Sequence, residues 1–202
     1  MANEYLLKEY ELCFEQLRFY DTRQESLLKY SLSLTSAVAT AQFGIYQLLH
    51  GATAAFFRCS AILSGLVFVA TALLFLMMLQ NRLYFVYVAR QINAIRRYLM
   101  EVAAEGFKNN QMYTSTDFPA LKPLSLQTLQ ILGAALISSG FAGASASAIR
   151  PAFGGGPCIT MGVWACILAL VFEVGGAMTY LHSAGRKPAD EAIHQRNEKK
   201  DS

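Results

Sequence analysis

Four long apolar runs with almost no charged side chains constrain this chain more than any other feature of its sequence. They cover residues 30–49, 61–79, 126–149 and 159–181. A helix needs about 20 apolar residues to cross the roughly 30 Å hydrocarbon core of a bilayer, and each run is close to that length. The runs therefore predict an all-α integral membrane protein with four transmembrane helices.

The lysines and arginines are distributed unevenly around these runs. Four lie in residues 1–29, six in residues 80–125 and five in residues 182–202, whereas each short connection within a pair of runs holds one. Cytoplasmic segments of membrane proteins carry an excess of Lys and Arg. The distribution predicts that both termini and the central segment lie in the cytoplasm, so that the spans form two hairpins whose tips face outward. These charges serve topology first, and at a net charge of +3 we expect no nucleic-acid partner.

The lengths of these segments leave room for one domain. Spans and connecting helices fill residues 1–183, which we expect to form a single four-span membrane domain. Residues 184–202 are polar and charged, and we expect a disordered cytoplasmic tail there. The N-terminus has no basic segment leading into a short apolar core, so the first span is expected to act as the insertion signal.

Two amphipathic stretches, about residues 4–29 and 82–105, flank the first pair of runs. Each carries apolar or neutral residues at alternating spacings of three and four, which predicts a heptad seam on a helix. The seam residues are Leu6, Tyr10, Cys13, Leu17, Tyr20, Gln24 and Leu27 in the first stretch, and Phe85, Val88, Ile92, Ile95 and Leu99 in the second. One stretch approaches the predicted membrane and the other leaves it, so we expect an antiparallel, cytoplasmic coiled pair.

The charges of the two stretches are complementary. Residues 1–29 hold six acids and four bases, whereas residues 82–105 hold four bases and two acids. Such charges select a partner and its orientation more than they add stability. Packing within the chain is the ordinary explanation for both seams, and packing between subunits or against a cytoplasmic protein partner is the alternative.

Glu173 is the one acidic or basic residue well inside a predicted span. A carboxyl group at bilayer depth is costly, so it is expected to face a bundle interior or an aqueous cavity. It lies on a stripe of mostly small residues where another helix can approach, formed by Gly162, Ala165, Ala169, Gly176 and Tyr180. Hydroxyl groups expected at a similar depth belong to Ser36, Thr40, Thr71 and Ser138.

This carboxyl group admits two roles. It could be a proton or cation relay, with the nearby hydroxyl groups as hydrogen-bond partners. It could instead be a neutral hydrogen-bond anchor that holds helices together, or lie among headgroups if the span ends earlier. A proton pathway usually shows several ionisable groups, and this chain has one, which favours the anchor.

Other polar and small residues suggest contacts rather than chemistry. Arg90, Arg96 and Arg97 could bind anionic lipid or a partner, although the predicted topology already accounts for their charge. Cys59 and Cys158 lie at the outer starts of their spans, where an oxidising exterior would allow a disulfide. The small residues at 140, 144 and 148 predict close packing of the third span, within the chain or between protomers.

No arrangement in the sequence predicts catalysis. The cysteines and histidines lack the spacing of a metal site, and no nucleophile has a positioned base. We therefore expect no enzyme, metal or cofactor.

The expected function is that of a multi-pass protein of the cytoplasmic (inner) membrane that oligomerises. It would act as a subunit, docking platform or pore-forming effector of a membrane complex, with lipid, other copies and a cytoplasmic protein at the heptad helices as partners. The alternative is a small transporter or an ion- or proton-conducting protein that uses Glu173.

Overall fold

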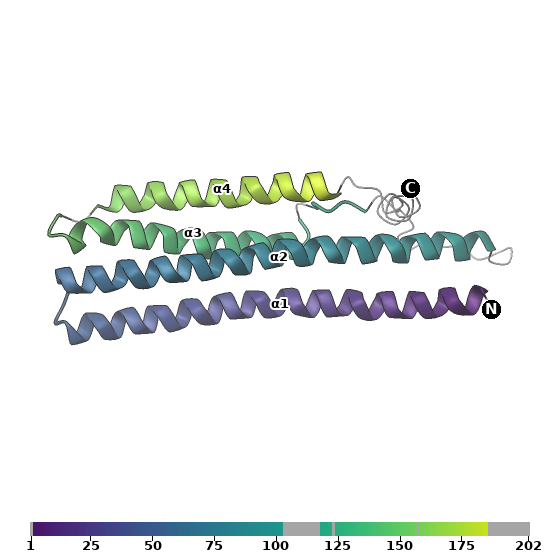
Figure 1. Ribbon diagram of the computed structural model, residues 1–202, viewed down its shortest axis with the longest axis horizontal. Helices are drawn as coiled ribbons and strands as arrows, with labels where there is room; N and C mark the ends of the chain where they lie inside the picture. The colour runs from purple at the N-terminus through teal and green to yellow at the C-terminus, as the bar shows by residue number, and fades with distance from the viewer. Residues whose placement is uncertain (1, 103–117, 123, 157, 186–202) are drawn as a thin grey trace, which may run out of the picture. The chain divides into compact units, whose positions relative to one another are not determined.

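The computed structural model describes residues 2–102, 118–122, 124–156 and 158–185, and all regular structure in these residues is helical. The predicted all-α class is confirmed. The helices are α1 (Ala2–Leu48), α2 (Ala54–Val102), α3 (Leu126–Ala152) and α4 (Ile159–Gly185), as labelled in Figure 1. The predicted tail begins later than expected, because residues 184 and 185 still belong to α4, and residues 186–202 lie outside the described residues.

Three of these helices are long and apolar enough to cross a membrane: α2, α3 and residues Ile159–Ala184 of α4. The first predicted span, residues 30–49, lies in α1, which is not among them. Serine, threonine and glutamine recur through this part of α1 and lower its hydropathy. The four-span count and the two-hairpin arrangement in the membrane therefore stay predictions.

The chain divides into two compact units. The first unit comprises Met1–Arg23, Gln80–Lys122 and Tyr180–Ser202, and the second comprises Gln24–Leu79 and Pro123–Thr179. The second unit contains three of the predicted spans and all but the last two residues of the fourth. Most of the apolar stretch of each candidate membrane helix is exposed. The share buried inside the chain is 33% in α2, 39% in α3 and 11% in α4.

Polar side chains connect neighbouring helices of the second unit. Gln42 on α1 donates a hydrogen bond to the Ser64 hydroxyl on α2 at 2.8 Å, and Ser145 on α3 donates to the Ala61 carbonyl of α2 at 2.9 Å. Near the start of α2, the Arg58 Nε donates to the Ala152 carbonyl at 2.9 Å. Such bonds hold helices together where water is excluded.

The backbones of α3 and α4 approach each other at two glycines. A Cβ atom added to Gly143 would lie 2.8 Å from the carbonyl oxygen of Gly162, and one added to Gly162 would lie 2.8 Å from that of Gly143. The predicted small-residue ladder is only partly used, because Ala148 is buried while Gly140 and Ala144 are exposed. The close contact is therefore made by Gly143, the residue before Ala144 of the predicted ladder.

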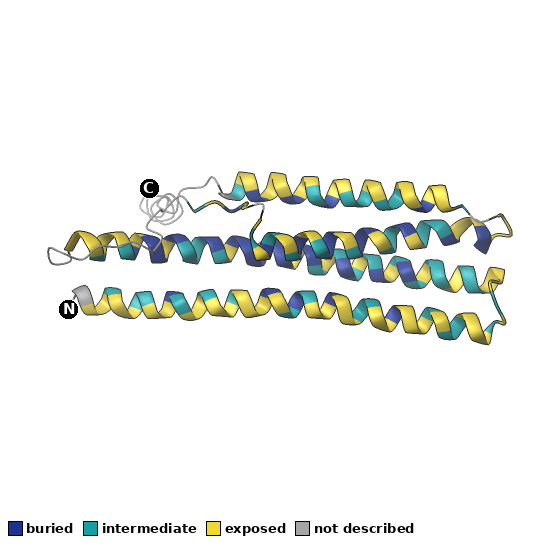
Figure 2. Ribbon diagram, turned by 180° about the vertical axis from the view of Figure 1, so that it is seen from behind, coloured by how far each residue is buried: buried dark blue, intermediate teal, exposed yellow. Residues whose placement is uncertain are grey.

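In the first unit, α1 and α2 contact each other in antiparallel order. Tyr10 pairs with Arg96 towards one end, and Tyr20 stacks on Tyr84 towards the other, with ring centroids 5.8 Å apart. Asn81 also donates to the Tyr20 carbonyl at 2.8 Å. Every residue of both predicted seams is buried or half-buried, and α2 is visibly more buried than α1 in Figure 2.

The glycine contact predicts that Gly143→Ala destabilises the second unit. The added methyl group meets backbone atoms of α4 that cannot rotate away, and such overpacking costs about 1–3 kcal/mol. Gly175→Ala is the matched control, because it makes the same change in α4, the other helix of this pair, with nothing within 4 Å. Thermal unfolding in detergent should show a lower midpoint for Gly143→Ala only, and equal midpoints for the two variants would contradict the contact.

Candidate functional site

A hydrogen bond between a serine and a carboxyl group joins α3 to α4 inside the second unit. The Ser138 hydroxyl donates to Glu173 Oε1 at 2.7 Å. The two side chains are 0% and 8% exposed, respectively. Both helices bring small residues to this contact, including Ala135 one turn before the serine and Ala177 one turn after the glutamate, so the polar pair is enclosed.

The second oxygen of this carboxyl group differs from the first. Glu173 Oε2 is buried, and among the described residues it has no hydrogen-bond partner. Buried polar atoms are nearly always paired, so an exception needs a physical explanation. A carboxyl group with one satisfied and one open oxygen can hold a proton or accept a donor from outside the described residues.

The other predicted hydroxyl groups do not meet Glu173. Thr71 is buried but donates to the carbonyl oxygens of Val67 at 2.8 Å and Phe68 at 3.1 Å. Ser36 and Thr40 are exposed, and each donates to the carbonyl oxygen four residues earlier in α1. Similar depth along the span therefore brings only Ser138 to the carboxyl group.

The stripe predicted around Glu173 is correct in its first part. Gly162 is buried and Ala165 and Ala169 are half-buried, whereas Gly176 and Tyr180 are exposed. Their places are taken by Ala177 and Leu181, which continue from Glu173 at spacings of four. The buried line thus drifts around α4, because successive spacings of four exceed the 3.6 residues per turn that the predicted stripe keeps.

Two buried arginines on α2 hold an extended segment of the first unit. Arg82 and Arg90 are 2% and 7% exposed. Their Nε atoms donate to the backbone carbonyls of Ala120 and Phe118, each at 3.0 Å. We call residues 118–122 the strap, because these two bonds fix it along α2.

A third arginine connects α2 to α1. Arg96 Nε donates to the Tyr10 hydroxyl at 3.1 Å, and its guanidinium lies 5.7 and 5.5 Å from the ring centroids of Tyr10 and Phe14. Arg90 and Arg96, predicted to bind lipid or a partner, are thus used within the chain, while Arg97 is exposed. Contact of these three arginines with lipid or a partner stays a prediction.

The sequence did not predict the contacts of Arg82, which holds the strap. Its guanidinium also lies over the rings of Phe85 and Phe118, 5.5 and 5.9 Å from their centroids. The available signal was the spacing of Arg82, Val86 and Arg90 by four, which puts the two cations on one helical face with an apolar residue between them.

Among the described residues, the cysteines suggest no metal-binding site. All four are free thiols in the structure, with Cys59 exposed and Cys158 half-buried, so their pairing stays a prediction. Burial, followed by the charge and hydrogen bond of Glu9, raises the pKa of the Cys13 thiol, which keeps it protonated. Within the described residues, no three His, Cys, Asp or Glu side chains lie close enough to share a metal ion.

The strap geometry predicts that Arg82→Gln and Arg90→Gln each loosen residues 118–122. Each change removes a hydrogen bond from a charged donor, and such a bond contributes about 1.5–3 kcal/mol. Hydrogen exchange of the strap amides should accelerate in both variants. Arg97→Gln is the control, because Arg97 is exposed on the same helix. Unchanged exchange in Arg82→Gln and Arg90→Gln would show that the two arginines do not hold the strap.

No protein-family model, curated protein or solved structure matches this chain.

Proposed function

We propose that this chain is a non-enzymatic, four-span protein of the cytoplasmic (inner) membrane, with its spans in two hairpins and both termini in the cytoplasm. It would oligomerise and serve as a docking subunit of a membrane complex. The lengths and compositions of α2, α3 and α4 support the membrane assignment. The Gln42–Ser64 bond supports α1 as the fourth span, because it satisfies a polar side chain that would otherwise be costly in lipid.

The outer surfaces of α3 and α4 support both lipid contact and assembly. Trp164, Leu168 and Phe172 are large, apolar and exposed on α4, as expected for side chains that face acyl chains. On α3, Gly140 and Ala144 are exposed and small, which would let the backbone of another copy approach closely. Assembly through this face would leave the Gly143 contact within the chain intact.

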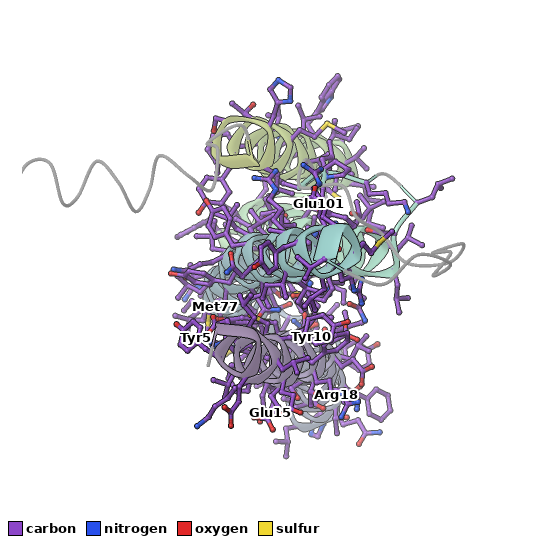
Figure 3. All side chains as sticks on the ribbon, turned by 90° about the vertical axis from the view of Figure 1, so that its right-hand side faces the viewer. Tyr5, Tyr10, Glu15, Arg18, Met77 and Glu101 are labelled. Atoms are coloured by element: carbon purple, nitrogen blue, oxygen red, sulfur yellow. The ribbon has the colours of Figure 1, made fainter. Side chains whose placement is uncertain are left out.

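An exposed apolar row on α1 is the observation that carries the docking proposal. Tyr5, Leu12 and Phe19 are seven residues apart, so they lie on one side of the helix, and all three are exposed. This row lies away from the seam that packs on α2. Figure 3 shows Tyr10 on the side of α1 towards α2, with Glu15 on the opposite side.

Acidic residues surround the N-terminal half of this row and indicate the kind of partner. Between residues 4 and 15 the chain has four acids, at 4, 9, 11 and 15, and a single base, Lys8. A partner helix with apolar residues at heptad spacing and lysines or arginines on either side matches both features. We therefore assign the row to a basic amphipathic helix of a cytoplasmic protein, and the coiled-coil contact would form there.

Conduction through Glu173 is a second candidate function. The buried carboxyl group with one open oxygen favours it, because functional carboxyl groups in membranes face bundle interiors. Against it, the hydroxyl groups expected to extend a pathway bond to backbone carbonyls instead. The docking subunit is therefore the better supported proposal.

The apolar row predicts selective binding of a cationic helix. In nanodiscs of zwitterionic lipid, we expect a labelled peptide with leucine at heptad spacing and flanking lysines to bind the full chain, measured by fluorescence anisotropy. Leu12→Glu should weaken binding about tenfold or more, since burying a leucine is worth about 1.5–3 kcal/mol.

Two controls make this result specific. Leu7→Glu adds the same charge to an exposed leucine on another side of α1 and should leave binding unchanged. A peptide with glutamates in place of lysines should not bind. Equal binding of both peptides, or equal loss in both variants, would reject the proposed docking row.

The four-span topology predicts that reporters fused to the two termini lie on the same side of the membrane. If α1 lies outside the bilayer, α2, α3 and α4 leave three spans, and the termini lie on opposite sides. A reporter pair in which one enzyme is active only in the cytoplasm and the other only outside distinguishes these cases. Opposite locations would overturn the four-span proposal.

A further inference from the structure

The buried Oε2 atom of Glu173 has no hydrogen-bond partner among the described residues, and a proton would satisfy it. We infer that Glu173 binds a proton on Oε2, so that the side chain is a neutral carboxylic acid at the contact between α3 and α4, with Oε1 accepting the Ser138 hydrogen bond. This inference rests on the carboxyl geometry and holds whether or not the chain docks a partner or conducts ions.

An ionised Glu173 would be costly in these surroundings. Glu173 is more than nine-tenths buried, and the described residues supply its carboxyl group with one hydrogen-bond donor, the Ser138 hydroxyl. An ionised carboxylate in such surroundings usually has a cation beside it or several hydrogen-bond donors. A single neutral hydroxyl group compensates a small part of the several kcal/mol that burial of an ion costs. Proton binding removes the charge and gives Oε2 a hydrogen.

Calcium and magnesium do not fit this site. Calcium takes about six to eight oxygen ligands and magnesium about six. Here the described site has the carboxyl group and one hydroxyl group, and one turn away on the two helices are Ala135, Ala169 and Ala177, which have no side-chain oxygen. No described cluster of three His, Cys, Asp or Glu residues exists to add ligands. The oxygen atoms of this site are too few for either metal ion, and they suit one proton.

A serine partner is compatible with a neutral Glu173. A serine hydroxyl can donate to Oε1 whether the acid is neutral or charged, so it orients the carboxyl group without fixing its protonation state. The same hydrogen bond gives the Ser138 hydroxyl a partner on α4. The hydroxyl group therefore orients the carboxyl group at the α3–α4 contact, and the proton on Oε2 keeps that group neutral.

A hydrophobic carbodiimide tests this inference, with full-length protein in zwitterionic liposomes at neutral pH. Dicyclohexylcarbodiimide reacts with a protonated carboxyl group: the acid proton moves to a carbodiimide nitrogen, the carboxyl oxygen bonds to the central carbon, and the adduct rearranges to a stable N-acylurea with no leaving group. We expect mass spectrometry to locate the adduct at Glu173. Ser138→Ala should keep the adduct, because the proton resides on the glutamate.

Infrared spectroscopy provides an independent readout on the same samples. The difference between wild-type protein and Glu173→Gln should contain the carbonyl band of a protonated acid and lack carboxylate bands. Carboxylate bands, or absence of an adduct at Glu173, would overturn the inference. Because labelling is read on the wild-type chain, a variant that fails to fold does not weaken the test.

The same variant separates this inference from the second candidate function. Proton flux into liposomes that is lost in Glu173→Gln would support conduction. A labelled, neutral Glu173 in a protein without flux would reject conduction and leave the proton-binding site standing.

Discussion

The requirement that buried polar atoms find partners away from water governs the second unit. A polar side chain connects each pair of helices that are neighbours in the chain: Gln42 to Ser64 between α1 and α2, Ser145 to the Ala61 carbonyl and Arg58 to the Ala152 carbonyl between α2 and α3, and Ser138 to Glu173 between α3 and α4. Apolar contact alone favours no particular neighbour in lipid, because acyl chains are as apolar as leucine. These bonds, with the Gly143–Gly162 approach, give each pair a defined register.

The first unit meets the same requirement by other means. The strap is extended, so its carbonyl oxygens have no helical donors, and Pro119 lacks an N–H to pair with a neighbour. Arg82 and Arg90 supply donors from α2. Arginine suits this task because its apolar stem packs along the helix while the guanidinium reaches several ångströms away. Arginines that the sequence analysis explained by topology alone thus also support the folded structure.

The sequence predicts which face of a single helix is buried, and it predicts contacts between two helices only in part. Both heptad seams lie on the less exposed faces of α1 and α2, because periodicity reports the face of a helix directly. Ser36 and Thr40 were placed near Glu173 by depth, yet depth says nothing about rotation around the helix axis. Arg82 was missed because a cation beside a span is explained by topology whether it is buried or exposed.

The polar composition of α1 is the point on which its place in the membrane depends. Hydropathy counts each serine, threonine and glutamine as if its polar atoms sought water. In α1, however, Thr35, Ser36 and Thr40 donate to carbonyl oxygens four residues earlier, at 2.8, 3.1 and 2.9 Å, and Gln42 donates to Ser64. Hydroxyl groups bonded to their own helix are satisfied even on a surface that faces lipid. The low hydropathy of α1 therefore overstates the cost of placing it in a bilayer, and its pairing with α2 lowers that cost further.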